Sequence, residues 1–183
     1  MIMILWVIII AACVGLDQLT KALISGSYAL NESHEIIRGV INFHYIKNTG
    51  AAWGIFSNHR WIFIVASMIL IVILPIILYR YRKAHFLFCF SLSIIIGGAI
   101  GNMIDRLFIG AVTDFIETAF MDFPVFNVAD CFVTVGAALM FIYLIFIDKT
   151  IFRSDKKSKK EADADVQELP KSDENDNTDG ESR

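Results

Sequence analysis

Long apolar runs alternate with short polar segments along the first 147 residues. Four runs stand out: residues 1–24, 61–79, 84–104 and 131–147. A bilayer core about 30 Å thick needs roughly 17 to 25 helical residues to cross it, and each run reaches that length. The pattern predicts an all-α polytopic membrane protein with four transmembrane helices.

A different period follows the first run. Ile41, Phe43 and Tyr45 alternate with polar residues, which is the period of a strand with one apolar face. We therefore expect a small β-sheet on the outer membrane surface. The stretch "NTGAAWG" after it predicts a turn, because Gly50 and Gly54 permit backbone conformations that other residues resist.

The segment between the third and fourth runs, residues 106–127, mixes apolar and polar side chains. Many of the apolar ones are phenylalanines, and Pro124 stands near its end. This composition predicts a short amphipathic segment lying in the membrane interface.

Composition supports the membrane assignment. Hydrophobic residues make up 56% of the chain and the mean hydropathy is +0.58, too apolar for a soluble domain. Residues 1–147 carry equal numbers of acidic and basic side chains, so the net charge of −3 belongs to residues 148–183. That charged tail has too few apolar residues to offset its ordering entropy, and we expect disorder there. The expected organisation is a membrane domain, 1–147, followed by the tail, 148–183.

The distribution of Lys and Arg predicts the orientation. Arg80, Arg82 and Lys83 join the second and third runs, and several lysines follow the fourth. Short positively charged loops tend to stay in the cytoplasm, which puts both termini there. Residues 25–60 and 106–127 are then on the outer side. The basic part of the tail is expected to lie against anionic lipid heads.

Cysteines offer one alternative reading of the first run. "IAAC", which ends at Cys13, is similar to the lipidation signal of secreted lipoproteins. That reading is disfavoured because no Lys or Arg precedes the run and three further apolar runs follow. Cys13, Cys89 and Cys131 all fall in apolar runs, so we expect buried small residues and no disulfide framework.

Polar residues recur where the runs meet the outer side. Asp17 and Lys21 are four apart and share a helix face. An interfacial ion pair that ends a helix would explain them. However, Asp17 lies inside the first apolar run, where an ionisable residue usually faces a partner or a polar cavity. The sequence leaves both readings open.

The third run ends with "GGAIGNMIDRL", in which Asn102, Asp105 and Arg106 share one face. The glycines allow close helix approach, and a structural role would explain all three polar residues. Arg106 has a second possible role, since its planar guanidinium can hold a carboxylate in a fixed geometry.

Two carboxylates raise the question of catalysis. Asn127 and Asp130 nearly form a capping box at the head of the fourth run, which explains both residues. No capping role is visible for Asp114, among apolar neighbours in "VTDF". Two carboxylates in a partly dry site can share a proton and act as base and acid in hydrolysis. From composition alone this aspartic peptidase chemistry is only weakly indicated.

Other chemistries lack comparable support. The four histidines show no metal-ligand spacing, and no serine has the context of a hydrolase nucleophile. We expect no metal and no cofactor.

Five motifs, "DQLTK", "NTGAAWGIF", "GGAIGNMIDRL", "VTDF" and "FPVFNVAD", resemble those of the lipoprotein signal peptidases (signal peptidase II) in order and in topology. The resemblance covers residues 1–147. It implies a four-span aspartic endopeptidase of the bacterial inner membrane that removes the signal peptide from prolipoproteins. Cleavage falls before a Cys that already carries diacylglycerol. The implied partners are such prolipoproteins and membrane lipid, with no nucleic acid, and the implied state is a monomer.

The resemblance also assigns site residues. Asp114 and Asp130 match the catalytic dyad, and Asp105 matches a position that we expect to be structural. The other matching positions line or brace the site: Asp17, Lys21, Asn48, Asn102, Arg106 and Asn127. The site is then expected near the outer leaflet, with the sheet as a cradle that clamps the peptide and residues 106–126 as a gate. Cys131 stands where the family often has Ser, and the tail is outside the family pattern.

Two other functions remain as alternatives. A small transporter or proton channel would also carry ionisable residues at the ends of its spans, although here the acids cluster towards one side. An assembly subunit would use the glycine-rich third run as a docking face.

Overall fold

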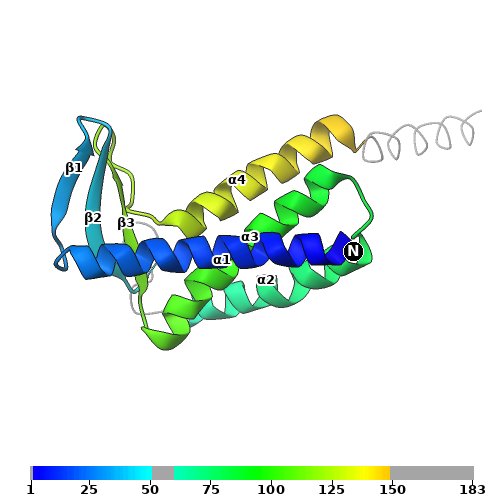
Figure 1. Cartoon of the computed structure of the whole chain (residues 1–183), viewed down its shortest axis with the longest axis horizontal. Helices are drawn as coiled ribbons and strands as arrows, with labels where there is room; N and C mark the ends of the chain where they lie inside the picture. Colours follow the sequence, from blue (N-terminus) through cyan, green and yellow to red (C-terminus); the bar gives the residue numbers. More distant parts are fainter. Residues whose placement is uncertain (1, 51–59, 149–183) are drawn as a thin grey trace, which may run out of the picture. The chain divides into compact units, whose positions relative to one another are not determined.

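The computed structural model describes residues 2–50 and 60–148. The elements in chain order are α1 (Ile2–Ser27), β1 (Ser33–Ile37), β2 (Ile41–Asn48), α2 (Arg60–Arg80), α3 (Phe86–Phe108), β3 (Val112–Thr118) and α4 (Val128–Ile142), with a π-helical turn at Tyr143–Ile147 (Figure 1). One compact unit extends to Tyr143 and holds the three strands and the four α-helices.

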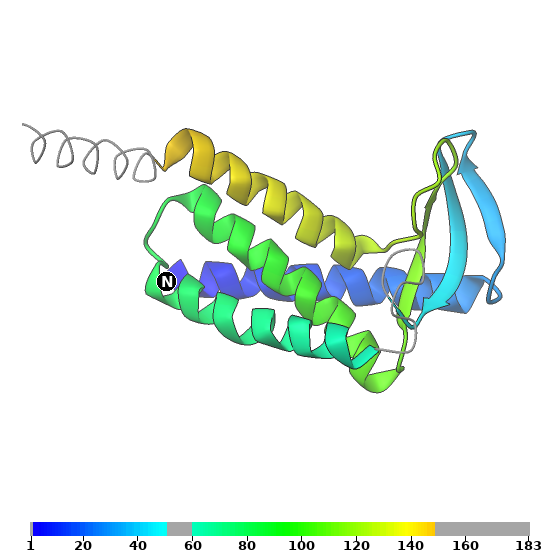
Figure 2. The ribbon, with the colours of Figure 1, turned by 180° about the vertical axis from the view of Figure 1, so that it is seen from behind.

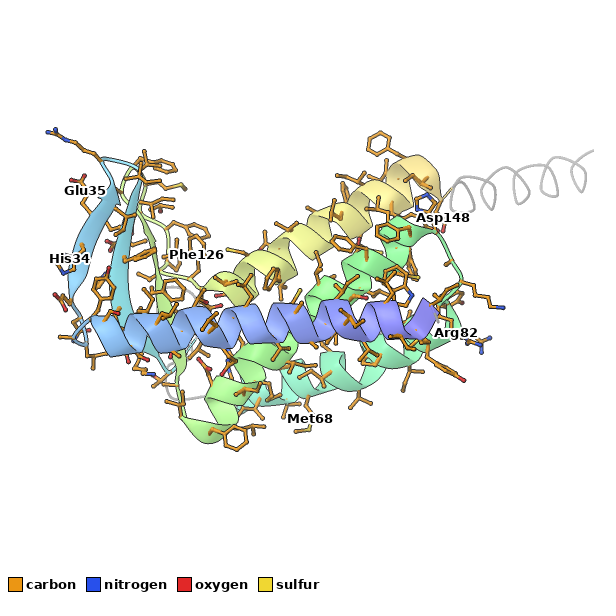
Figure 3. The ribbon with its side chains drawn as sticks, in the orientation of Figure 1. His34, Glu35, Met68, Arg82, Phe126 and Asp148 are labelled. Carbon is orange, nitrogen blue, oxygen red and sulfur yellow. The ribbon has the colours of Figure 1, made fainter. Side chains whose placement is uncertain are left out.

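Three helices are long and apolar enough to cross a membrane: Ile2–Ser27, Phe86–Phe108 and Val128–Ile147. The first, third and fourth predicted spans are thus confirmed as apolar helices of sufficient length. The second predicted span is also helical, over Arg60–Arg80, and its described apolar portion is the shorter Ser67–Arg80. Crossing of the membrane by α2 stays a prediction. Met68 on α2 points away from the other helices, as a lipid-facing side chain would (Figure 3).

Helix α3 is the centre of the helical layer. It contacts α1, α2 and α4 (Figures 1 and 2). Within the apolar windows, 67% of α3 is buried, against 17% of α1 and 6% of the α4 span. Its glycines make the approach possible, because a methyl group at Gly98 would overlap the carbonyl oxygen of Ala129 on α4.

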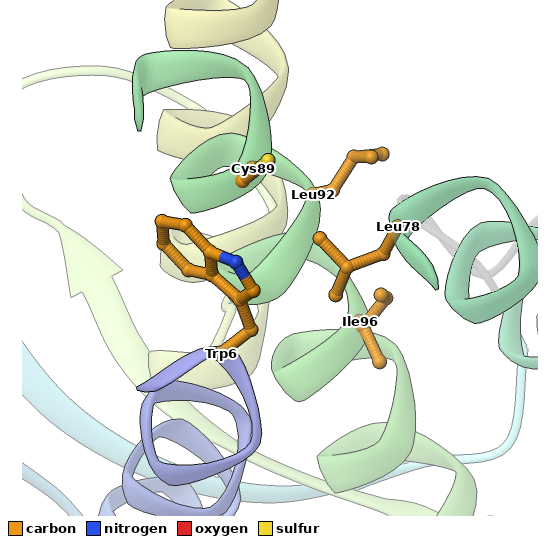
Figure 4. Close-up of a cluster of buried hydrophobic side chains, with 5 residues drawn as sticks. All are labelled: Trp6, Leu78, Cys89, Leu92 and Ile96. Carbon is orange, nitrogen blue, oxygen red and sulfur yellow. The ribbon is translucent and has the colours of Figure 1, made fainter. Parts of the chain in front are cut away.

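A cluster of buried apolar side chains joins α1, α2 and α3 near the start of α1. It consists of Trp6, Leu78, Cys89, Leu92 and Ile96 (Figure 4). All three cysteines are free, and Cys13 and Cys89 are fully buried. The predicted burial is confirmed for Cys13 and Cys89, whereas Cys131 is partly accessible.

The three strands form one antiparallel sheet in the order β1-β2-β3. The alternation after the first run is confirmed as β2. The amphipathic interfacial segment predicted for residues 106–127 is corrected in part: α3 continues to Phe108, and Val112–Thr118 is the third strand. Over Val112–Phe115 the prediction was wrong, because these four residues of β3 are all buried and face protein rather than the membrane interface. For the rest of residues 106–127 it stays a prediction.

The sheet is attached to the end of α1 by a second apolar cluster. Ile24 of α1, Tyr45 of β2 and Phe115 of β3 are its buried members. Phe43 and Phe115 meet edge to face across the two strands, with ring centroids 5.7 Å apart. These contacts fix β3 against the helices and thereby position Asp114.

Two predictions concern residues that are only partly described. Of the turn predicted at "NTGAAWG", the structure describes residues 48–50. Of the tail predicted to be disordered, it describes Asp148 alone. The division into 1–147 and 148–183 therefore stays a prediction.

Candidate active site

Polar side chains converge where α1 and α3 meet β3 and the start of α4. Six of these side chains are buried, and each is either an ionisable group or an amide: Asp17, Lys21, Asn102, Asp105, Asp114 and Asn127. Every buried side-chain nitrogen and oxygen among the described residues has a hydrogen-bond partner. The cluster is thus a fully connected polar network inside an apolar bundle.

The first turn of α4 holds Asp130 in a capping box. The backbone N–H of Asp130 donates to Asn127 Oδ1, and the backbone N–H of Asn127 donates to Asp130 Oδ2, both at 3.1 Å. This confirms the capping predicted from "FNVAD". The other carboxylate oxygen, Oδ1, accepts a 2.8 Å hydrogen bond from Asn102 Nδ2. Asp130 therefore caps its helix while its carboxyl also takes part in the polar network.

Asp114 reaches the same place from β3. Its Oδ1 accepts from Asn127 Nδ2 at 2.6 Å and its Oδ2 from Asn48 Nδ2 at 2.8 Å. Only 2% of the residue is exposed. Burial, followed by repulsion from Asp130, raises the pKa of Asp114 to about 7, against the opposing effects of the two asparagine hydrogen bonds and the Lys21 charge.

Asn127 connects the two carboxyls. Its side chain donates to Asp114, and its backbone N–H donates to Asp130. The same Nδ2 also donates to Asn102 Oδ1 at 3.0 Å, and Asn127 is completely buried. One fixed residue therefore sets the relative placement of both carboxyls.

Lys21 lies behind this pair in a buried ion cluster. Its Nζ is 2.9 Å from Asp17 Oδ2 and 3.3 Å from Asp105 Oδ2, and it donates to Asn102 Oδ1 at 2.9 Å. Asp17 is completely buried, so of the two readings of the Asp17–Lys21 pair the structure favours the internal one. The pair belongs to the polar network rather than to an exposed helix end.

The carboxyls of the pair open onto a cavity of about 560 Å³. Its polar lining comprises Asn48, Asn102, Arg106, Asp114, Asp130 and Thr134. Its apolar lining comprises Val112, Phe123, Pro124, Val125, Phe126, Cys131 and Val135. Phe126 lies between the sheet and the start of α4 (Figure 3), where backbone hydrogen bonds to Ile116 hold it beside β3.

Some of the residues predicted to line or brace the site line the cavity, and others do not. Asn48, Asn102 and Arg106 line it together with the two aspartates, whereas Asp17, Lys21 and Asn127 are not among the described lining residues. Arg106 is in the last turn of α3, within electrostatic reach of Asp130 and Asp114, and its Nη1 donates to Asn102 O at 3.3 Å.

Sequence reasoning missed two members of the network, Gln18 and Thr113. Gln18 Nε2 donates to Asp17 Oδ2, Gly101 O and Asp105 Oδ1 at 3.0 to 3.1 Å. The backbone N–H of Thr113 donates to Asp105 Oδ2 at 2.8 Å. Gln18 could have been found, because a polar glutamine inside an apolar run is unusual. Thr113 could not, because it contributes through its backbone N–H, which every residue except proline has.

This geometry suits hydrolysis by a carboxyl pair. Like charges close together in a dry site cannot both ionise, so such a pair retains one proton near neutral pH. The ionised member can take a proton from water while the protonated member donates to a carbonyl oxygen.

Comparison with known proteins identifies the family. The model of the family described as signal peptidase (SPase) II matches residues 9–146. The lipoprotein signal peptidase of Listeria monocytogenes serotype 4a (strain HCC23) is 40% identical over 154 residues, 83% of this chain and 96% of the relative. That of Enterococcus faecalis (strain ATCC 700802 / V583) is 38% identical over 148 residues, 81% of this chain and 92% of the relative.

Two solved structures of bacterial membrane enzymes have a similar fold, each with 34% sequence identity. One, determined by the in meso method at 2.3 Å resolution, has a TM-score of 0.69 and covers 76% of this chain and 87% of its own. The other, at 1.9 Å resolution, has a TM-score of 0.68 and covers 78% and 93%. The family model and the sequence relatives show that the chain belongs to the signal peptidase II family.

Proposed function

We propose that the chain is a membrane aspartic endopeptidase that removes the signal peptide from diacylglyceryl-modified prolipoproteins, with Asp114 and Asp130 as its catalytic dyad. Family membership supports the removal of signal peptides from prolipoproteins. One observation carries the catalytic assignment: the two carboxyls line the same cavity and are bound by the same residue, Asn127.

The two carboxyls have different surroundings, which suggests different roles. The pKa of Asp114 is about 7, so this carboxyl holds a proton up to neutral pH. Asp130 is in the first turn of α4, where the helix dipole and two N–H donors stabilise negative charge. We therefore assign Asp130 as the base and Asp114 as the acid.

Hydrolysis then proceeds in two steps. Asp130 takes a proton from water, the water oxygen bonds to the carbonyl carbon of the peptide bond before the lipidated Cys, and Asp114 gives its proton to the carbonyl oxygen. The diol intermediate collapses when Asp130 returns its proton to the leaving nitrogen and the C–N bond breaks. Asp114 regains a proton from a diol hydroxyl, which leaves a carboxyl on the signal peptide and an amine on the Cys.

The asparagines and Arg106 support this chemistry without changing covalently. Asn48, Asn102 and Asn127 donate to carboxyl oxygens of the dyad and so fix the directions of their free lone pairs. Arg106 places a positive charge on the cavity wall near both aspartates. Such preorganised groups stabilise charge that develops in the transition state.

The cavity also fits a substrate that is held in a membrane. Its wall is mostly apolar and includes Cys131 and Val135 of α4, an apolar span. With both termini in the cytoplasm, the end of the bundle that meets the sheet is on the outer side, so the site lies near the outer leaflet. A lipidated substrate would arrive there by lateral diffusion, with the sheet as a cradle for its peptide.

The test uses Asp114→Asn and Asp130→Asn in purified protein with a diacylglyceryl-modified prolipoprotein. Both variants should lose cleavage. Asp122→Asn is the matched control, because Asp122 is an exposed carboxylate in the same stretch of chain. Near-normal cleavage by either dyad variant would overturn the catalytic assignment.

A further inference from the structure

The residue before each aspartate of the dyad is anchored by a buried carboxylate from another element. The N–H of Thr113, which precedes Asp114, donates to Asp105 Oδ2 of α3 at 2.8 Å. The N–H of Ala129, which precedes Asp130, donates to Asp17 Oδ1 of α1 at 3.0 Å. The backbone leading into each carboxyl of the dyad is thus fixed from outside its own strand or helix.

A single lysine joins the two anchoring carboxylates. Lys21 Nζ lies 2.9 Å from Asp17 Oδ2 and 3.3 Å from Asp105 Oδ2, and 4% of Lys21 is exposed. Gln18, on the same helix, adds a parallel bridge through Nε2, at 3.1 Å from Asp17 Oδ2 and 3.0 Å from Asp105 Oδ1. The two anchors are therefore held at a fixed separation by α1.

Lys21 also orients a side chain that binds the dyad directly. It donates to Asn102 Oδ1, and so does Asn127 Nδ2. With two donors on its oxygen, the amide of Asn102 must present Nδ2 to Asp130 Oδ1, as it does at 2.8 Å. Loss of Lys21 would remove one of the two donors that determine this orientation.

We propose that Lys21, assisted by Gln18, is a positioning residue that sets the separation of the Asp114 and Asp130 carboxyls by joining the anchors Asp17 and Asp105. The inference rests on the proposed function, because it takes these two aspartates as the catalytic pair. None of the four network residues is among the described residues that line the cavity, so they act through the dyad and not on the substrate.

The first test is Lys21→Met. A misplacement of reacting groups by about 1 Å can lower a rate about 100-fold, so kcat per folded enzyme should fall by about that factor. KM should stay within about two-fold of the wild-type value, since no cavity wall changes. Lys83→Met is the matched control: Lys83 is an exposed lysine in the turn between α2 and α3, and its loss should leave both constants unchanged.

The second test, Gln18→Met, separates position from charge. Gln18 is uncharged, so its replacement alters no ion pair and still removes one of the two bridges. We expect kcat to fall about 3- to 10-fold with KM unchanged, the effect of one or two hydrogen bonds. If Lys21→Met does not fold, the kcat of Gln18→Met still tests whether the bridge between Asp17 and Asp105 positions the dyad.

The outcomes distinguish this inference from the proposed function. If Asp114→Asn cleaves normally, the dyad assignment fails and the positioning role fails with it. If Asp114→Asn is inactive but the folded fractions of Lys21→Met and Gln18→Met show wild-type kcat, the dyad stands and the positioning role is overturned. A raised KM with unchanged kcat would overturn it as well. A purely structural role would lower only the yield and the melting temperature.

Discussion

Two pairs of carboxylates lie side by side in this protein, and they differ in the groups that connect their members. Lys21 stands between Asp17 and Asp105, whereas the amide of Asn127 connects Asp114 to the capping box of Asp130. The first pair has a positive charge at bonding distance. The second pair has neutral donors, and the pKa of Asp114 rises to about 7. A cation bonded to both members thus sets the first pair apart from the proposed catalytic pair, whose bonded donors are amides and a backbone N–H and whose nearby cation, Arg106, lies on the cavity wall.

The two pairs also differ in whether they line the cavity. Asp114 and Asp130 line it, while Asp17 and Asp105 are not among its described lining residues. Ionised carboxylates that are paired and hydrogen-bonded make a rigid scaffold, and a carboxyl with a pKa near neutrality can act as an acid. The comparison predicts that changes in the two pairs have different consequences.

The largest expected effect is on cleavage by Asp114→Asn. Removing one member of a catalytic unit typically costs about 10⁴-fold or more in kcat. Folding should persist, with a melting temperature within about 4 °C of wild type, because among the described residues this carboxyl is held by neutral amides rather than by an ion pair. Cleavage assays and thermal unfolding of the same preparation check both parts. Wild-type cleavage by this variant, or its failure to fold, would contradict the prediction that Asp114 serves catalysis rather than stability.

The next effect is on stability, in Lys21→Met. This change leaves two buried carboxylates without their cation, and breaking such a cluster costs about 3–5 kcal/mol of unfolding free energy. Denaturant or thermal unfolding in detergent measures it, with Lys83→Met as the control. A loss below about 1 kcal/mol would mean that the cluster behaves like an exposed ion pair.

A smaller loss is expected for Gly101→Ala. The added methyl group on α3 would overlap the carboxylate of Asp17 on α1, and the two helices would have to move apart there. Overpacking of this kind costs about 1–3 kcal/mol, and part of the cleavage activity should be lost with it. Gly15→Ala is the matched change, since nothing lies within 4 Å of the methyl group added there. Equal melting temperatures for the two variants would contradict the prediction.

Asn48→Leu should shift the dependence of kcat/KM on pH and leave the melting temperature unchanged. The hydrogen bond from Asn48 stabilises ionised Asp114 and lowers its pKa, so its loss raises that pKa further. Since Asp114 must be protonated to act as the acid, the fall in kcat/KM on the basic side should shift to higher pH. Asn42→Leu, which instead removes a bond to Glu117, should leave the profile in place. If the rise in kcat/KM on the acidic side moves to higher pH and the basic side stays in place, Asp114 is the base and the assignment of acid and base is reversed.

The smallest effect is expected for Glu117→Gln on the sheet. This carboxylate is partly exposed, and hydrogen bonds from Asn42 and His44 lower its pKa, the opposite of the direction at Asp114. A surface pair of this kind contributes about 1 kcal/mol at most. Cleavage and melting temperature should match wild type, and a large loss of activity would give the sheet a part in the chemistry.

Much of the fold was predictable because its signals are local. Apolar run length predicted the helices, alternation at Ile41 to Tyr45 predicted β2, and the spacing of Asn127 and Asp130 predicted the capping box. Strand β3 was not predicted, because residues Val112 to Phe115 are buried on both faces of the strand and so lack the alternation that marks a strand in the sequence. Its burial depends on packing against α1 and β2, and short sequence windows do not contain that information.

The site was predictable in its residue types and less so in its connections. Spacing put Asp17 with Lys21, and resemblance to a family assigned the dyad, its asparagines and Arg106. The bonds that anchor Thr113 and Ala129 were not foreseeable, since their donors are backbone groups and Ala129 is 112 positions from its acceptor Asp17. Contacts of this kind arise only when the chain has folded.

The most direct test of the account is the pH dependence of kcat/KM for cleavage of a diacylglyceryl-modified prolipoprotein, measured from roughly pH 5 to pH 9. Asp114, with its pKa of about 7, must keep its proton to act as the acid. The account predicts that kcat/KM falls as the pH rises above about 7 and that this fall tracks the ionisation of one carboxyl. A rate that stays constant or keeps rising to pH 9 would contradict a proton shared by Asp114 and Asp130.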